Sequence, residues 1–79
     1  MSSDAVFETV RSCAVEVLQV APEEVTMEAD FTDHLGATSL TLVELVMAIE
    51  EACSVDLPDD GVESVRTVRD ACELVRARI

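Results

Sequence analysis

Ser39 and His34 are the side chains in the middle of the chain whose types could support chemistry, and a glycine turn separates them. The segment from 34 to 52 reads H-L-G-A-T-S-L-T-L-V-E-L-V-M-A-I-E-E-A. A serine hydroxyl at the start of an apolar stretch can cap a helix, or it can be esterified with a phosphodiester. A helix N-terminus suits the second role because its free amides and the positive end of its dipole stabilise an anion. The residues alone leave both roles open.

Asp33, His34 and Ser39 together could also suggest a hydrolytic triad. Adjacent Asp and His side chains are poorly placed to orient one another, and the G-x-S-x-G sequence that presents a nucleophilic serine is absent. We therefore expect His34 to be a solvated loop residue rather than a general base.

Neither the cysteines nor the acidic loop near the end of the chain indicates a metal site. The cysteines stand singly at 13, 53 and 72, without a C-x-x-C pair, so no disulfide framework or zinc site is indicated. The D-L-P-D-D-G stretch at 56–61 resembles a calcium loop, but proline replaces one ligand and Thr67 stands where a bidentate glutamate belongs. We expect Cys53 and Cys72 to be buried thiols.

A helix from Leu40 to Cys53 must position Ser39. This segment contains no glycine or proline and is rich in good helix formers. Thr38 can cap it instead of Ser39. Thr41 and Glu44 have the spacing of a capping box three residues farther on, so the sequence leaves the start of the helix undecided within one turn. Helical spacing predicts a core-facing stripe of Leu42, Leu45, Val46, Ile49, Ala52 and Cys53.

A second apolar strip lies on the same helix, roughly 130° around its axis from the first. It consists of Leu40, Val43 and Met47, with Glu44 and Glu51 on one side and Glu50 on the other. Periodicity leaves open whether this strip packs on another part of the fold or binds a partner.

The remaining segments complete a small helical protein. Helices are predicted over 4–20, capped by Ser3 or Asp4 and closed before Pro22, and over 67–79, capped by Thr67. A short helical segment is expected at 59–65. The predicted fold class is all-α, a small four-helix bundle of three main helices and one short helix with no strands. The inward residues expected on the outer helices are Phe7, Val10, Ala14, Val17, Leu18, Val68, Ala71, Cys72, Val75 and Ile79.

The connection from 22 to 35 is long and acidic. We expect its apolar residues, Val25 and Phe31, to be buried. Gly36 supplies the permissive backbone for the turn into the central helix. The carboxylates of this connection are expected to be solvated: Glu23, Glu24, Glu28, Asp30 and Asp33.

Length and charge restrict the class of function. The 79 residues make a single domain, 1–79, expected to be monomeric, with a net charge of −12. Between Ser12 and Val65 there are thirteen carboxylates and no basic residue, which disfavours nucleic-acid binding and suits basic partners. The chain shows no secretory signal and no apolar run long enough to cross a membrane, so we expect a cytoplasmic location.

The segment L-G-A-T-S-L followed by V-E-L-V-M-A-I-E-E resembles the acyl carrier proteins. That family has the pattern L-G-x-D-S-L, and its serine carries 4′-phosphopantetheine. The resemblance covers nearly the whole chain, from Val25 and Phe31 to the acidic segment at 57–60 and the last helix. It implies that a phosphopantetheinyl transferase esterifies Ser39 with the arm of coenzyme A, whose thiol then holds acyl thioesters. The protein would be a carrier and not an enzyme.

The resemblance also implies a surface for partner enzymes. The partners would be acyltransferases, ketosynthases, or adenylating and ligase enzymes with basic docking patches. The residues assigned to the docking surface are Thr38, Leu40, Val43, Glu44, Met47, Glu50 and Glu51, extended by Asp59, Asp60 and Glu63.

Two threonines depart from the family pattern. Thr38 replaces the aspartate before the serine, and Thr41 occupies a position that is often aspartate in the fatty-acid members. These changes favour a discrete carrier in polyketide or mixed polyketide–peptide biosynthesis over one in housekeeping fatty-acid synthesis. A peptidyl carrier fits less well because two glycines usually precede its serine, although an aminoacyl cargo stays open. The alternative from another class is an unmodified acidic interaction module.

Overall fold

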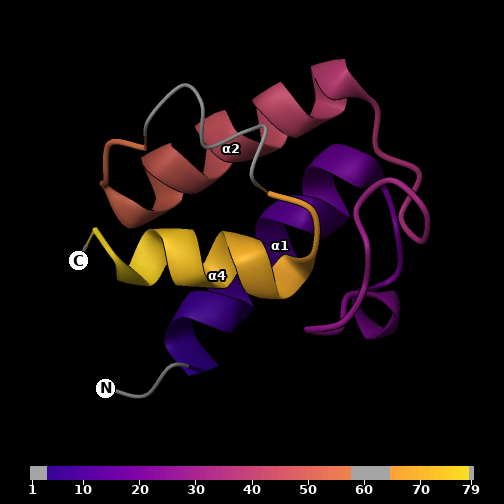
Figure 1. Ribbon diagram of the computed structural model, residues 1–79, viewed down its shortest axis with the longest axis horizontal. Helices are drawn as coiled ribbons and strands as arrows, with labels where there is room; N and C mark the ends of the chain where they lie inside the picture. Colours follow the sequence, from indigo (N-terminus) through magenta and orange to yellow (C-terminus); the bar gives the residue numbers. More distant parts are fainter. Residues whose placement is uncertain (1–3, 58–64, 79) are drawn as a thin grey trace.

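The fold is helical and is described by a computed structural model for residues 4–57 and 65–78. In chain order the elements are α1 (Asp4–Leu18), the 3₁₀ turn η1 (Pro22–Glu24), α2 (Ser39–Cys53) and α4 (Val68–Arg76) (Figure 1). Within these ranges there is no strand, and an isolated antiparallel bridge joins Asp30 to Thr67. The all-α prediction is confirmed, while the short helix expected at 59–65 lies almost entirely outside the described residues.

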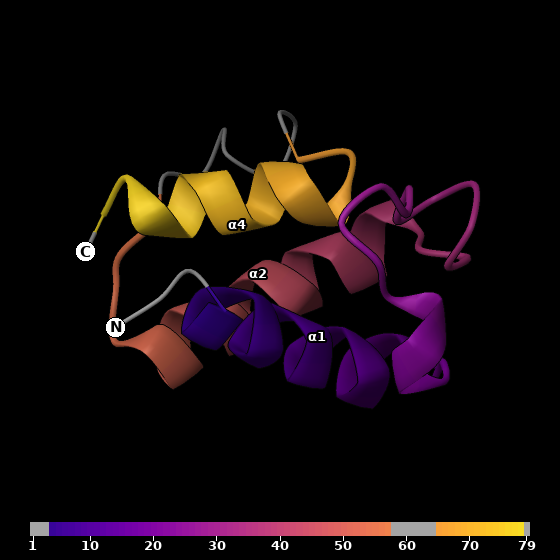
Figure 2. The ribbon, with the colours of Figure 1, turned by 90° about the horizontal axis from the view of Figure 1, so that it is seen from below.

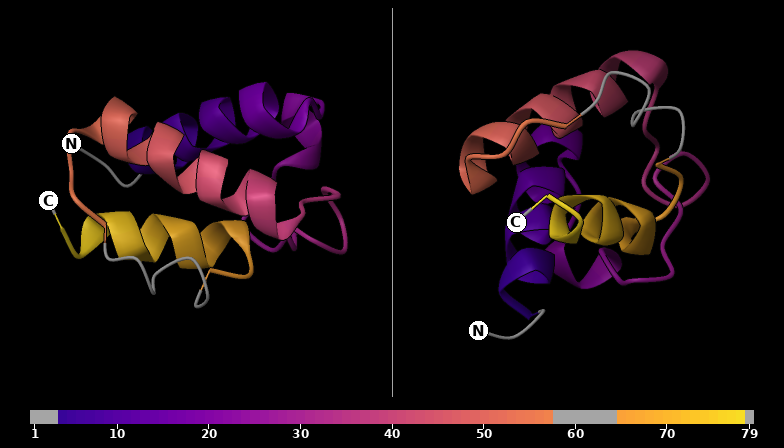
Figure 3. Two further views of the ribbon diagram at one scale, coloured as in Figure 1. Left: turned by 90° about the horizontal axis from the view of Figure 1, so that it is seen from above. Right: turned by 60° about the vertical axis from the view of Figure 1, so that its left-hand side comes forward.

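Helix α1 packs against α2 and α4 and runs in the direction opposite to them (Figure 2). The end of α1, the loop from 19 to 38 and the first turns of α2 and α4 therefore gather at one end of the molecule (Figures 2 and 3). Ser39 lies at this end because it is the first residue of α2. None of the described helices is long and apolar enough to cross a lipid bilayer.

A hydrophobic core holds the helices together. Val25 and Phe31 are buried as expected, so the long loop contributes directly to the core instead of lying over it. The fully enclosed side chains come from every described helix and from this loop; the largest are Phe31, Leu45, Ile49, Val10, Val25, Val68, Val75 and Cys72.

Helix α1 is shorter than predicted and turns a slightly different face inward. It ends at Leu18 because Gln19 adopts a left-handed conformation with φ of 58°. Of the predicted inward residues, Val10 and Ala14 are buried and the others are half-buried. Val6 and Cys13 take their place, since Val6, Val10, Cys13 and Ala14 also follow helical spacing.

The core-facing stripe of α2 is confirmed in its centre and wrong at its end. Leu45, Val46 and Ile49 are buried, but Ala52 is exposed. Ala52 lines an open groove between α1 and α2, and its methyl group is too short to close that groove. Leu42 and Cys53 are half-buried.

The predicted start of helix α4, with Thr67 as its cap, is confirmed. Thr67 accepts a hydrogen bond from the Asp70 amide, at 3.2 Å, and the Asp70 carboxylate accepts one from the Thr67 amide, at 3.1 Å. The helix ends at Arg76, earlier than predicted, and Ile79 lies outside the described residues. Its predicted inward residues are otherwise confirmed as buried: Val68, Ala71, Cys72 and Val75.

Candidate functional site

Ser39 is exposed and occupies the first helical position of α2, while Thr38 is the capping residue. The Thr38 hydroxyl oxygen accepts a hydrogen bond from the Thr41 amide, at 3.2 Å, and the Thr41 hydroxyl oxygen accepts one from the Thr38 amide, at 2.7 Å. The capping box predicted from Thr41 and Glu44 is therefore wrong, because Thr41 already lies inside the helix as the return partner of Thr38. Within the described ranges no side-chain hydrogen bond involves the Ser39 hydroxyl, so this group is left available for modification.

The backbone that leads into α2 is fixed by the loop before it. Gly36 has φ of 72°, a left-handed conformation that strains other residues, although nothing lies within 4 Å of where its Cβ would be. The Ala37 amide donates to the Phe31 carbonyl at 2.7 Å, and Ala37 itself is buried. The chain therefore reaches Ser39 from an anchored segment.

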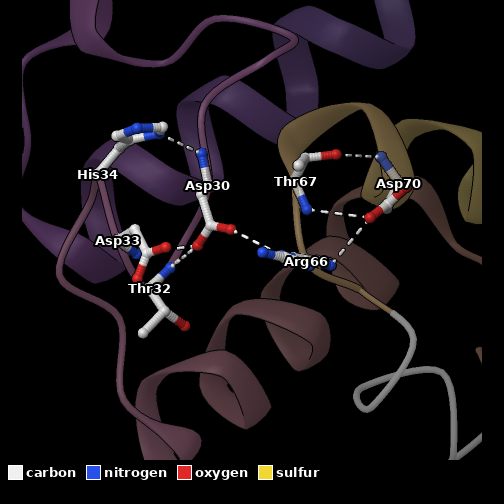
Figure 4. Close-up of polar contacts among 7 residues, drawn as sticks. All are labelled: Asp30, Thr32, Asp33, His34, Arg66, Thr67 and Asp70. Atoms are coloured by element: carbon white, nitrogen blue, oxygen red, sulfur yellow. Dashed lines mark hydrogen bonds and ion pairs between the residues drawn. The ribbon is translucent and has the colours of Figure 1, made fainter.

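Asp30 was expected to be solvated, and this expectation is wrong: only 8% of the residue is exposed. Its Oδ1 accepts hydrogen bonds from the amides of Thr32 and Asp33, at 2.9 and 2.8 Å, and its Oδ2 accepts one from Arg66 Nε at 3.1 Å (Figure 4). Asp30 thus forms a turn in which its own side chain accepts hydrogen bonds from the amides two and three residues later. These hydrogen bonds offset the free-energy cost of burying the carboxylate.

Hydrogen bonds to the carboxylate keep Asp30 ionised. The pKa of Asp30 is lowered, first by the hydrogen bond from the Asp33 amide, then by Arg66 and the Thr32 amide, while burial acts in the opposite direction. The charged carboxylate is therefore the form that holds this turn.

The same cluster fastens the loop to the beginning of α4. The Phe31 amide donates to the Arg66 carbonyl at 2.9 Å, and the Val68 amide donates to the Ala29 carbonyl at 3.0 Å. Asp70 Oδ2 accepts from the Arg66 amide at 3.1 Å, which continues the network into the helix (Figure 4). The loop before Ser39 is thus held by α4 as well as by its own turn.

His34 is exposed, as expected, but it has a structural partner. Its Nδ1 accepts a hydrogen bond from the Asp30 amide at 2.8 Å (Figure 4). This bond uses the ring to close the loop and requires the proton of the neutral ring to be on Nε2.

The second apolar strip of α2 is exposed. Leu40 is 67% exposed, Val43 43% and Met47 61%, and these are the exposed large hydrophobic residues of the described part of the chain. Thr38, Glu44 and Glu51 are also exposed beside it. We call Leu40, Val43 and Met47 the apolar strip.

Glu50 has a role that the sequence did not reveal. It is half-buried, and its Oε2 accepts a hydrogen bond from the Leu57 amide at 2.7 Å, so it holds the segment that follows α2. The other predicted contributors to the acidic surface, Asp59, Asp60 and Glu63, lie outside the described residues.

The cysteine thiols are poorly suited to chemistry. Cys13 and Cys72 are buried and Cys53 is half-buried, which confirms the expectation for Cys72 but not fully for Cys53. Burial is the main cause that raises the pKa of each thiol. A thiol with a raised pKa is a weak nucleophile because little of it is thiolate. Over the described residues, no group of three or more potential ligands is arranged to hold a metal ion.

Known proteins match this chain over most of its length. The family described as "Phosphopantetheine attachment site" matches residues 8–75. The acyl carrier protein of Phenylobacterium zucineum (strain HLK1) is 47% identical over 74 residues, which is 94% of each chain. The acyl carrier protein of Sulfurovum sp. (strain NBC37-1) is 45% identical over 71 residues, 90% of this chain and 95% of the relative.

The helical fold and this match define a small carrier for a covalently attached 4′-phosphopantetheine. The chain belongs to the acyl carrier protein family and is a carrier rather than an enzyme. As in that family generally, its arm is installed by a phosphopantetheinyl transferase, and it interacts with enzymes. The start of α2 fits such an arm, because its first amides have no intrahelical acceptor and can face a phosphodiester.

Proposed function

We propose that Ser39 is the attachment residue and that its arm presents acyl, or aminoacyl, thioesters to partner enzymes. The observation that carries this proposal is that Thr38, and not Ser39, caps α2, while the Ser39 side chain is exposed at the helix start. A serine that served only as a helix cap would have its oxygen engaged with a first-turn amide.

An intact-mass experiment tests the attachment site. The apo protein is incubated with coenzyme A, Mg²⁺ and a broad-specificity phosphopantetheinyl transferase. We expect a gain of one phosphopantetheinyl group, lost in Ser39→Ala and retained in Ser54→Ala, which removes another exposed serine at the other end of α2. A gain that persists in Ser39→Ala would overturn the assignment.

The proposed pathway is polyketide or mixed polyketide–peptide biosynthesis, with the chain acting as a monomeric, single-domain, cytoplasmic carrier. Thr38 and Thr41 support this proposal because they place hydroxyl groups, where fatty-acid members often have carboxylates, beside the attachment point. A role in fatty-acid synthesis is the second candidate, which the relatives named acyl carrier protein favour equally.

Reconstituted fatty-acid elongation distinguishes these pathways. If the pathway is specialised, the holo protein should be a poor substrate for the elongating enzymes, and Thr38→Asp should raise its turnover. Efficient elongation on the unaltered protein would favour fatty-acid synthesis. Adenylating enzymes that load an amino acid onto the arm would instead indicate a peptidyl carrier.

The proposed docking surface is the apolar strip of Leu40, Val43 and Met47 with the carboxylates around it. Exposed apolar area beside acidic groups suits enzymes that have basic patches, because opposite charges accelerate and orient association. The proposed partners are acyltransferases, ketosynthases, and adenylating or ligase enzymes. Family membership favours this carrier role over that of an unmodified interaction module.

A further inference from the structure

The sequence places two competent capping residues side by side at the start of α2. Thr38 and Ser39 both have side-chain oxygens that can accept a hydrogen bond from a first-turn amide. If Ser39 were the cap, the helix would begin at Leu40, and the Ser39 backbone would become extended. Its hydroxyl oxygen would then bond an amide of the first turn instead of being available for modification.

Thr41 decides between these two registers. In the observed register Thr41 is the third helical residue, and its hydroxyl oxygen accepts from the Thr38 amide at 2.7 Å. If the helix began one residue later, the third position would be Leu42, which has no oxygen to return this bond. The reciprocal capping box therefore exists only in the register that leaves Ser39 uncapped.

A third bond also belongs to the observed register. The Leu42 amide donates to the Thr38 carbonyl at 2.9 Å, so the first turn of backbone hydrogen bonding starts at Thr38. The two hydroxyl groups lie 3.3 Å apart, within hydrogen-bonding distance of each other. Thr38 and Thr41 thus hold the helix start through both side chain and backbone.

We propose that Thr38 and Thr41 are positioning residues that lock the register of α2, so that Ser39 presents its hydroxyl to the phosphopantetheinyl transferase. This inference rests on the proposed attachment at Ser39. It assigns to the threonines a function that depends on hydrogen bonding and not on charge.

Steady-state kinetics of phosphopantetheinyl transfer to Ser39 test whether the two threonines fix the register of α2. Thr38→Val keeps the side-chain shape but removes the acceptor, so part of the population should shift to the Ser39-capped register. The transferase would still bind those molecules, because residues farther along α2 are unchanged, but it could not modify them. We expect kcat to fall about three- to tenfold with little change in KM, from the size of a typical capping effect. Thr38→Ser restores the oxygen and should restore kcat.

Thr67→Val is the matched control. Thr67 caps α4 with the same geometry, its oxygen accepting from the Asp70 amide at 3.2 Å, so its loss should cost similar stability without changing the start of α2. Its kcat should equal that of the unaltered protein. An equal fall of kcat in Thr67→Val and Thr38→Val would overturn the lock in favour of general destabilisation.

The ¹³Cα and ¹³Cβ chemical shifts of Ser39 provide a readout besides activity. They should move from helical toward extended values in Thr38→Val and Thr41→Val and stay helical in Thr67→Val. Unchanged shifts together with unchanged kcat in Thr38→Val would overturn the lock while leaving Ser39 as the attachment residue. Persistent modification of Ser39→Ala would instead overturn the attachment itself.

Discussion

Asp30 Oδ2 lies 3.1 Å from Arg66 Nε, and this ion pair joins a carboxylate side chain that is 11% exposed to an arginine side chain that is 78% exposed. The pair is asymmetric: Arg66 is largely exposed to solvent, while Asp30 is enclosed by the loop that it closes. The two residues are 36 positions apart in the chain, so their contact links the segment before Ser39 to the start of α4.

Acid should weaken the fold through Asp30. Its folded-state pKa is lowered, so the stability that it contributes is present above its unfolded pKa, about 3.9, and is lost as pH falls through the folded value. Asp30→Asn removes this titration and should flatten the decline of the melting temperature below about pH 4. Thermal unfolding followed by circular dichroism from pH 2 to 7 measures the effect. Asp33→Asn, an exposed neighbour, is the control; identical acid profiles for Asp30→Asn and the unaltered protein would contradict the prediction.

Partner turnover should depend on both the apolar and the acidic residues of the proposed docking surface. Met47→Ala removes the exposed end of the apolar strip and Glu44→Lys reverses a charge beside it, so each should lower kcat/KM of the holo protein with a partner enzyme by roughly tenfold. Helicity should be unchanged, since both side chains are exposed. Glu73→Lys makes the same charge reversal on an exposed position of α4 and should have little effect. Equal loss in Glu73→Lys and Glu44→Lys would mean that net charge, and not this face, matters.

Two substitutions of Glu50 can separate the effect of its charge on partner binding from the effect of its hydrogen bond on stability. Glu50→Ala removes the acceptor of the Leu57 amide and should lower the free energy of unfolding by roughly 1–2 kcal/mol. Glu50→Gln keeps an oxygen there and should lose much less stability while removing the charge. Chemical denaturation measures the first effect and partner kinetics the second. Similar stability losses in both variants would show that the hydrogen bond is not the cause.

At a residue with a left-handed backbone conformation, a change to glycine should stabilise the protein, and a change from glycine to alanine should destabilise it. Ser54 ends α2 with φ of 55°, so Ser54→Gly should stabilise the protein by about 0.5–1 kcal/mol. Gly36→Ala should destabilise it by about 1–2 kcal/mol through the backbone alone, because no atom lies within 4 Å of the added Cβ. Denaturation midpoints give both values. Stabilisation by Gly36→Ala would contradict the assigned conformation.

Periodicity and capping patterns predicted much of this fold. The central stripe of α2, the start of α4 and the burial of Val25 and Phe31 follow from apolar spacing and from the residue types that cap helices. The errors fall where two patterns compete. Residues 6–18 offer two overlapping stripes, and only packing against α2 and α4 selects Val6 and Cys13 over Phe7 and Val17.

The candidate residues could be proposed from the sequence, but the contacts that hold them in place could not. Ser39 and the apolar strip stand out in sequence, whereas the choice of Thr38 as cap depends on a hydroxyl–amide pair that competes with other possible pairs. The sequence does not distinguish Asp30 from the other acidic residues of its loop, because its burial depends on Arg66, far away in the chain. Long-range partners of this kind leave no local pattern.

The hydrogen bond from Ala37 to Phe31 determines which part of a loaded carrier can move. Ala37 stands two residues before Ser39, and its amide is bound at 2.7 Å to the carbonyl of a residue that has no exposed surface. The polypeptide therefore cannot swing Ser39 outward without disturbing Phe31 in the core. With the arm on Ser39, as we propose, the travel of a thioester between active sites must come from rotation about bonds of the prosthetic arm, and each enzyme must bring its reaction centre within the reach of that arm.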